Sequence, residues 1–239
     1  MAIARQPSLL DLDDRPSHDA GFADLRHVAL DRGAWVDVVP GWVTGHEALF
    51  ETVLAAADWQ VWTRSMFDRV VEQPRLSTSW ADTALPPALW AVREMAVSLS
   101  ARYGQRLTRI SANLYRDGSD SVAWHGDTHL RTLPTATVAV LSLGHARPFR
   151  LRPRGGGPSL GWDLGRGDLV VMGGTCQRTW QHAVPKVASA GPRICVMFRT
   201  ANAEGPRRLR RDPRHRGWRC QLDARQPVGG PTSPPASQL

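Results

Sequence analysis

The stretch Thr137-Val-Ala-Val-Leu-Ser-Leu143 belongs to a run of short, β-branched or alternating segments that glycine and proline interrupt. Such segments are typical of β-strands, and eight of them follow one another from Arg109 onward. They cover residues 109–114, 122–125, 137–143, 149–151, 160–163, 168–172, 179–182 and 193–200. Eight short strands at this spacing predict a jelly roll or barrel rather than a parallel sheet. Such a fold has a pocket at one end, where side chains from different strands converge.

Helical patterns precede the strands. Thr44-Gly-His-Glu47 has the form of a capping box, in which hydroxyl and carboxylate satisfy each other's backbone amides, and it predicts a helix over residues 48–57. A second helix is expected over residues 87–102, where apolar residues recur at helical spacing and Gly104 supplies a left-handed stop. These apolar residues are Leu89, Val92, Ala96 and Leu99. The expected fold class is α+β, mainly β: a double-stranded β-helix (jelly roll) core with N-terminal helices packed on it.

Composition divides the chain into four regions. Residues 1–32 are charged and irregular and are expected to form an N-terminal arm. Residues 33–106 hold the two helices, and residues 107–202 hold the jelly-roll core. Residues 203–239 are first basic and then rich in glycine, proline and serine, which is typical of a flexible tail. The arginines between Arg207 and Arg219 fit either a phosphate-binding arm or a solvated tail.

The overall charge points to a polyanionic partner. The formal net charge is +8 and the pI is about 10.7, which favours nucleic acid. Three widely spaced cysteines without a CxxC pattern argue against a disulfide framework or a zinc ribbon. Neither a signal peptide nor an apolar run of transmembrane length is visible. We therefore expect a cytoplasmic monomer with one catalytic domain and no membrane contact.

Three residues have the types and order of a metal site. In Val122-Ala-Trp-His-Gly-Asp-Thr128, strand alternation places His125 and Asp127 on one face, so both side chains can reach one metal ion. His182, in a second extended run, supplies the third ligand type of a facial iron triad, in which the opposite coordination positions stay open. An isolated pair of this kind more often reflects hydrogen bonding, so the hypothesis depends on the residues that accompany it.

Two further pairs are suited to a carboxylate ligand. In Arg193-Ile-Cys-Val-Met-Phe-Arg199 the two arginines are six positions apart, so they share one strand face while the other face is apolar. A guanidinium binds a carboxylate through two parallel hydrogen bonds. Asn113 and Tyr115 also share a strand face, and both can donate to a carboxylate. A surface salt bridge would equally explain the arginines, and backbone hydrogen bonds would explain the second pair.

Taken together, these motifs resemble the AlkB family of Fe(II)- and 2-oxoglutarate-dependent dioxygenases. The resemblance rests on Asn113-Leu-Tyr-Arg-Asp-Gly118, His125-Gly-Asp127, Leu141-Ser-Leu-Gly144, Gly167-Asp-Leu-Val-Val-Met-Gly-Gly174, His182 and Arg193 to Arg199. It implies that Fe(II) is bound by His125, Asp127 and His182. It also implies that 2-oxoglutarate is held by Asn113, Tyr115, Arg193 and Arg199, with Arg193 at the distal carboxylate.

The implied activity is direct-reversal repair by oxidative dealkylation. With Fe(II), 2-oxoglutarate and O2, such an enzyme removes methyl and other alkyl groups from bases of DNA, or of RNA, and releases formaldehyde, succinate and CO2. The base would be taken from a single strand or flipped out of a duplex. Two other interpretations stay open. One is the same oxygenase chemistry on tRNA, protein or a small molecule, and the other is a non-catalytic jelly-roll protein that binds metal.

In this family the region between the helices forms a lid over the nucleotide. Arg69 and Arg75 are candidates for phosphate contacts there, and Trp80 is a candidate for stacking on the base. Tryptophan is more often a core or covering residue, and this chain has ten. Arg154, beside the glycines 155–157, is a further candidate for a phosphate contact, although a solvated hairpin tip has the same composition.

The sequence departs from the family at one position of the expected substrate pocket. Many members carry an acidic residue two positions after the metal-binding aspartate, where it accepts a hydrogen bond from the exocyclic amine of the base. This chain has His129 instead. A neutral imidazole can still accept a hydrogen bond, but a protonated one would repel a cationic methylated base. His129 is therefore a candidate substrate contact that puts the choice of base in question.

Overall fold

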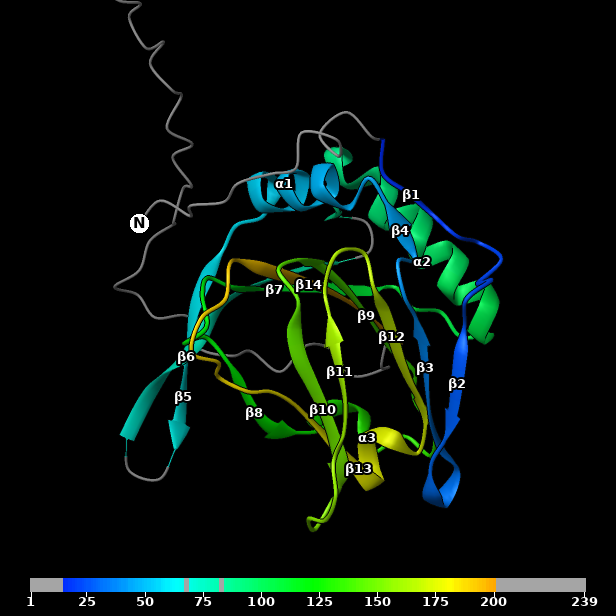
Figure 1. Ribbon diagram of the computed structural model, residues 1–239, viewed down its shortest axis with the longest axis vertical. Coiled ribbons are helices and arrows are strands. Elements are labelled where there is room, and N and C mark those ends of the chain that lie inside the picture. The colour runs from blue at the N-terminus through cyan, green and yellow to red at the C-terminus, as the bar shows by residue number, and fades with distance from the viewer. Residues whose placement is uncertain (1–14, 67–68, 82–83, 201–239) are drawn as a thin grey trace, which may run out of the picture.

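The computed structural model describes residues 15–66, 69–81 and 84–200, which form two facing antiparallel sheets (Figure 1). The large sheet has the strand order β2 (Arg26–Ala29), β3 (Ala34–Val39), β12 (Leu169–Gly174), β9 (Val138–Gly144), β14 (Arg193–Arg199), β7 (Arg109–Tyr115), β6 (Arg69–Trp80) and β5 (Gln60–Met66). The small sheet has the order β11 (Leu160–Leu164), β10 (Arg147–Pro153), β13 (Trp180–Val184) and β8 (Val122–His125). A separate pair joins β1 (Ser17–His18) to β4 (Val43–Thr44). The eight strands expected from the sequence are β7 to β14, so the mainly β, jelly-roll class is confirmed.

Two helices cover the outer face of the large sheet, on the side away from the small sheet (Figure 1). They are α1 (His46–Ala56) and α2 (Trp90–Tyr103), while α3 (Cys176–Thr179) is a single turn before β13. Short 3-10 helices are η1 (Asp31–Gly33), η3 (Pro87–Leu89) and η4 (Thr128–Leu130). The second expected helix is confirmed, and it ends at Gly104 with a φ of 62°, in the left-handed region. Within the described residues, no helix is long and apolar enough to cross a membrane.

The expected capping box is wrong. The residue that precedes α1 is Gly45, with a left-handed φ of 62°, and no side chain caps this end by a hydrogen bond. Thr44 instead belongs to β4, where its hydroxyl lies 3.1 Å from the hydroxyl of Ser17. Because Thr44 is part of a strand pair, its hydroxyl is not available to the first turn of the helix, which begins two residues earlier than expected.

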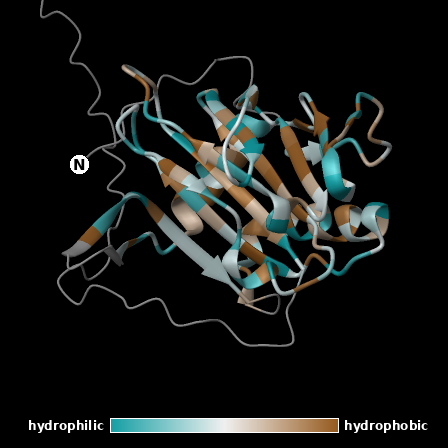
Figure 2. Ribbon diagram, turned by 90° about the horizontal axis from the view of Figure 1, so that it is seen from below, coloured by the Kyte–Doolittle hydropathy of each residue, from teal (hydrophilic) through white to brown (hydrophobic). Residues whose placement is uncertain are grey.

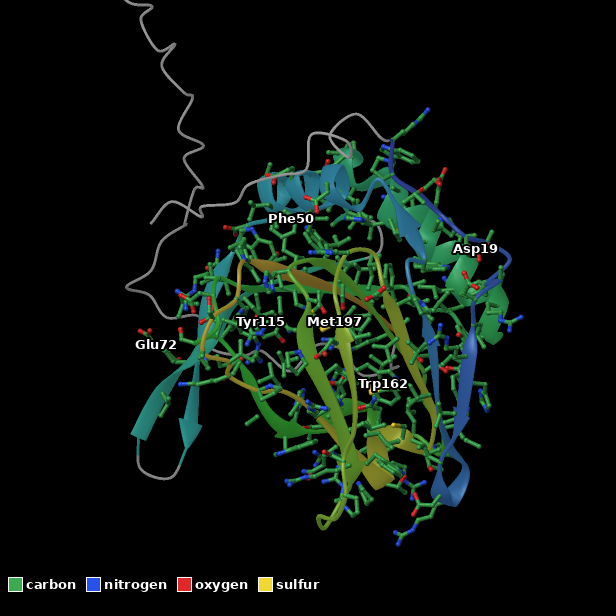
Figure 3. The ribbon with its side chains drawn as sticks, viewed as in Figure 1. Asp19, Phe50, Glu72, Tyr115, Trp162 and Met197 are labelled. Carbon is green, nitrogen blue, oxygen red and sulfur yellow. The ribbon has the colours of Figure 1, made fainter. Side chains whose placement is uncertain are left out.

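Alternation along the strands of the large sheet separates two cores. In β14, Ile194, Val196 and Phe198 pack toward the helices, whereas Cys195 and Met197 lie between the sheets. Figure 3 shows Met197 inside the jelly roll and Phe50 of α1 on the opposite side of the large sheet. Apolar segments accordingly concentrate in the central strands (Figure 2). The space between the sheets is therefore where the inward-facing polar residues of β7, β13 and β14 meet.

The N-terminal region is more regular than expected. The division into an irregular arm and a separate core missed β2 and β3, which pair with each other and, through β3, with β12 of the jelly roll. The region that was expected to form a lid is also part of the large sheet, because β6 pairs with β7. These strands depend on hydrogen bonds to distant segments, which local composition does not reveal. Residues 1–14 of the arm and the tail 203–239 lie outside the described residues.

Candidate metal and cosubstrate site

Two strands and one turn of the small sheet bring the three candidate metal ligands together. His125 ends β8 and is the direct partner of His182 in β13, with ring centroids 4.2 Å apart. Asp127 follows β8 and precedes η4. One ligand atom from each of the three residues lies within 4.8 Å of the other two. Two imidazoles and one carboxylate at this spacing form a facial ligand set for a divalent metal.

The turn that carries Asp127 is held against α3. A side chain at Gly126 would lie 2.8 Å from the carbonyl oxygen of Gln177, so only glycine permits this close approach. The amide of Asp127 donates to the side-chain oxygen of Gln177 at 2.9 Å. Gln177 was not among the residues expected in the site, because no sequence motif includes it and its burial is visible only in the structure.

Burial and neighbouring charges set the protonation of the triad. Burial lowers the pKa of His182 to about 3, helped by the nearby imidazole of His125, and burial also lowers the pKa of His125. Burial alone would raise the pKa of Asp127, but Arg199 and the histidines more than offset it and the pKa is lowered. Nδ1 of His125 donates to the carbonyl of Ala123 at 2.9 Å, which leaves Nε2 with its lone pair. All three groups are therefore in the form that binds metal.

Arg199 lies at the metal end of the site. Its Nε donates to Asp127 at 2.5 Å, and a terminal nitrogen donates to the hydroxyl of Ser111 at 2.6 Å. A carboxylate held in this way keeps its charge and a fixed orientation. The structure thus places Arg199 against a candidate metal ligand, next to the space expected for 2-oxoglutarate.

Arg193 is a buried cation with an incomplete set of partners. Its side chain is 1% exposed, and one terminal nitrogen donates to the hydroxyl of Ser142 at 2.7 Å. Nε and the other terminal nitrogen have no hydrogen-bond partner among the described residues. A buried guanidinium is costly unless an anion accompanies it. The arrangement therefore fits a bound carboxylate, and Ser142, a lone hydroxyl in the apolar strand β9, is a residue that the sequence analysis missed.

The second expected pair also faces the space between the sheets. Asn113 accepts a hydrogen bond from the hydroxyl of Ser77 at 2.7 Å, and its amide nitrogen lies 3.7 Å from the sulfur of Met197. Tyr115 is buried, and its ring centre lies 5.3 Å from the guanidinium carbon of Arg193. Burial raises the pKa of Tyr115, so the phenol keeps its proton and can donate. Figure 3 shows Tyr115 and Met197 on the same side of the large sheet.

Three of the expected substrate contacts lie near the triad. Arg75 is half-buried, and its guanidinium donates to the carbonyl of Ser121 at 3.5 Å. His129 belongs to η4, directly after Asp127, and burial lowers its pKa. Arg154 donates to the carbonyl of Arg178 at 2.8 Å and approaches the turn at Gly126.

The other two expected substrate contacts are Trp80 and Arg69. Trp80 packs against the helix-side core, on the face of β6 opposite to Ser77, so the structure does not bring it to the triad. Because side chains alternate between the two faces along β6, a tryptophan at this position covers the core and not the site. Arg69 begins β6, but its side chain lies outside the described residues.

Comparisons with known proteins identify relatives of this chain. The family model of the 2OG-Fe(II) oxygenase superfamily matches residues 51–214. The alpha-ketoglutarate-dependent dioxygenase alkB homolog 3 is 29% identical in its human form over 206 residues and 30% identical in its bovine form over 205, in each case 77% of this chain and 69% of the relative. DNA oxidative demethylase ALKBH2 of Arabidopsis thaliana is 34% identical over 120 residues, 40% of this chain and 38% of the relative. The solved structure of OsALKBH1 superimposes with a TM-score of 0.52 at 15% identity, over 74% of this chain and all of that one, and shows the shared fold.

Proposed function

The chain belongs to the AlkB family of 2OG-Fe(II) oxygenases, whose members use Fe(II), 2-oxoglutarate and O2, and we propose that it removes alkyl groups from nucleobases of DNA by oxidation. The observation that carries the proposal is that the His125, Asp127 and His182 group and the incompletely paired Arg193 occur within one jelly roll. A nucleic-acid substrate is supported by the DNA oxidative demethylases among the relatives and by the net charge of +8.

Different residues would bind the iron and the 2-oxoglutarate. His125, Asp127 and His182 would hold iron on one side and leave the other side open. Arg193 and Ser142 would bind the distal carboxylate of 2-oxoglutarate, while Asn113 and Tyr115 donate to the same cosubstrate. With iron and cosubstrates bound, the site supplies oxidation of an alkyl C–H bond, and the products are succinate, CO2, formaldehyde and the unmodified base.

Arg199 is assigned to orientation. Its hydrogen bond to Asp127 would keep one carboxylate oxygen directed away from the arginine and toward the metal. Its contact with Ser111 anchors the guanidinium on β7, so the carboxylate cannot rotate freely. The two histidines remain neutral at physiological pH because burial lowers the pKa of each, and they therefore do not compete for protons with metal binding.

The test is mass spectrometry of single-stranded oligonucleotides that carry 1-methyladenine, 3-methylcytosine, 1-methylguanine or 3-methylthymine. Each is incubated with protein, Fe(II), ascorbate, O2 and 2-oxoglutarate, beside an Asp127→Ala control and an RNA of the same sequence. Loss of the methyl mass with the unaltered protein alone is the expected result. If succinate forms at one rate with and without every oligonucleotide and no methyl mass is lost, the oxygenase acts on another class of substrate, such as protein or a small molecule.

A further inference from the structure

Two arginines lie side by side next to the metal triad. Arg109 of β7 and Arg199 of β14 are direct cross-strand partners, and both lie on the face of the large sheet that carries Ser111. Like charges directly opposite each other are unfavourable unless an anion lies between them. Burial, and next the charge of Arg199, lower the pKa of Arg109, so the two guanidinium groups lie close together.

Asp127, the anion near these two arginines, already has other partners. Asp127 acts on both arginines, but its hydrogen bond goes to Arg199 and its carboxylate is part of the candidate metal group. Within residues 15–66, 69–81 and 84–200, the side chain of Arg109 makes no hydrogen bond or ion pair. Arg109 is therefore a half-buried, donor-rich group that faces the reaction space and has no hydrogen-bond partner among the residues that the structure describes.

A third arginine adds to the positive charge of this space. Arg75 lies on the same face of β6 as Ser77, and it acts on His125 electrostatically. Its Nε is buried and has no hydrogen-bond partner among the described residues. His129, next to Asp127, carries no negative charge in either protonation state.

The other acidic residues of this region are directed elsewhere. Asp120 binds Arg116 through both carboxylate oxygens, at 2.8 Å each, and Glu72 also acts on Arg116. Figure 3 shows Glu72 at the outer edge of the molecule, on the β5–β6 hairpin. Among the described residues, the reaction space is thus lined by cationic donors, and its one carboxylate is the candidate metal ligand.

We propose that the site selects alkylated bases that are neutral and that present a ring carbonyl beside the alkylated nitrogen, with Arg109 as the residue that determines this specificity. A guanidinium can only donate, so it complements the carbonyl oxygens of N3-alkylated thymine or uracil and of N1-alkylated guanine. N1-alkylated adenine and N3-alkylated cytosine are cations at neutral pH, and the arginines repel them. The inference rests on the proposed function and names its substrate class.

The decisive comparison uses two methylated pyrimidines of similar size. 3-Methylthymine and 3-methylcytosine differ in the exocyclic group at C4, in the C5 methyl group of thymine and in charge, and each is placed at the same position of one single-stranded DNA. We expect the Fe(II)-loaded protein to demethylate the thymine lesion with a kcat/KM at least about 10-fold higher. Fluorescence anisotropy without O2, with Fe(II) and 2-oxoglutarate bound, should rank the two oligonucleotides in the same order.

Two variants test whether Arg109 causes the preference for neutral bases. Arg109→Gln should lower the ratio of the two kcat/KM values at least about 5-fold, mainly by slowing the thymine lesion. Arg106→Gln removes the same charge from an exposed position three residues earlier and should leave the ratio unchanged. If Arg109→Gln does not fold, Arg109→Lys, which keeps the charge, replaces it as the second variant. The ratio of the two kcat/KM values for the unaltered protein then still decides whether neutral bases are preferred.

The outcomes separate the two hypotheses. Demethylation of the cytosine lesion at an equal or higher kcat/KM overturns the preference for neutral bases and leaves nucleobase dealkylation standing. Failure to demethylate any of the four methylated bases overturns both. A clear preference for the thymine lesion that Arg109→Gln does not alter shows that another group determines the specificity and removes the role assigned to Arg109.

Discussion

At the residue scale, two arginines of one strand meet different partners. Arg199 is neutralised by Asp127, whereas Arg193 meets one hydroxyl and an aromatic ring. A buried guanidinium with neutral partners alone is costly, and a bound carboxylate would offset that cost. The difference predicts that the two arginines serve different parts of the site.

Replacement of Arg193 should therefore affect the cosubstrate and spare the metal. We expect Arg193→Met, which keeps the unbranched stem but removes the guanidinium, to raise the KM for 2-oxoglutarate about 10- to 100-fold, the equivalent of about 1.4 to 2.7 kcal/mol. Fe(II) affinity, measured by titration, should stay within about 2-fold because Arg193 does not contact the triad. Arg150→Met, at an exposed position of the small sheet, is the matched control. An equal loss of iron and 2-oxoglutarate affinity would contradict the assignment.

The triad also predicts how the stability of the metal-free protein depends on pH. The pKa of His182 is about 3 in the folded protein and about 6.5 in the unfolded chain, so between these values the unfolded chain binds the extra proton. Stability should fall as the pH falls below 6.5, with a slope of up to about 1.4 kcal/mol per pH unit from this residue. Urea unfolding at pH 7.0 and 5.5, with EDTA present, measures the slope. His182→Asn should reduce it, and an unchanged slope would show that His182 is not held neutral.

At the element scale, one glycine permits the packing of α2 on the large sheet. Gly173 of β12 is the cross-strand partner of Trp35, and a Cβ atom there would fall within the volume of the indole ring. The ring of Trp35 stacks on Tyr103, at the end of α2, with centroids 5.6 Å apart and an interplanar angle of 19°. The glycine thus leaves room for the aromatic contact that joins strand to helix.

A methyl group at this glycine should loosen that contact. We expect Gly173→Ala to lower the free energy of unfolding by about 1 to 3 kcal/mol, because Trp35 must shift away from Tyr103. Gly161→Ala in β11 is the matched control, since the new methyl group there meets only the end of the exposed and flexible Arg150. Its effect should stay within about 0.5 kcal/mol. Chemical denaturation monitored by tryptophan fluorescence would distinguish the two, and equal effects would argue against the stacking contact.

At the scale of the whole molecule, one buried arginine connects segments that are far apart in sequence. Arg147 begins β10, is fully buried, and donates to the carbonyls of Asp117 (2.8 Å), Asp120 (2.9 Å) and Pro185 (2.9 Å). It thereby holds the turn after β7 against the end of β13. These are the strands that carry Tyr115 and His182, so Arg147 supports the relative placement of the cosubstrate and metal residues.

Loss of Arg147 should destabilise the fold. Arg147→Met leaves three carbonyls, one of them fully buried, without their donor, and we expect a loss of about 2 to 5 kcal/mol in the free energy of unfolding. Arg150→Met removes an exposed arginine from the same strand and should change stability by less than about 0.5 kcal/mol. Urea denaturation measures both, and similar values for the two variants would contradict the role of Arg147.

The local sequence pattern was sufficient to predict much of the fold and of the candidate site. The strands β7 to β14 and the helix α2 were predictable because residue type and alternation repeat within each segment. The face shared by Arg193 and Arg199, and that shared by Asn113 and Tyr115, follow from the same period of two. The strands β2 and β3 were missed because their partners, such as β12, lie far along the chain.

The sequence by itself determined that the segments of β7 to β14 become strands, which of their side chains share a face, and which residue types can hold a metal and a carboxylate. Only the tertiary structure decided that His125 pairs with His182, that Asp127 binds Arg199, and that Trp80 covers the core. The physical reason is that alternation is a local property of the backbone. Pairing, burial and the resulting pKa values depend on which strands become neighbours, and that is settled when the two sheets close over one another.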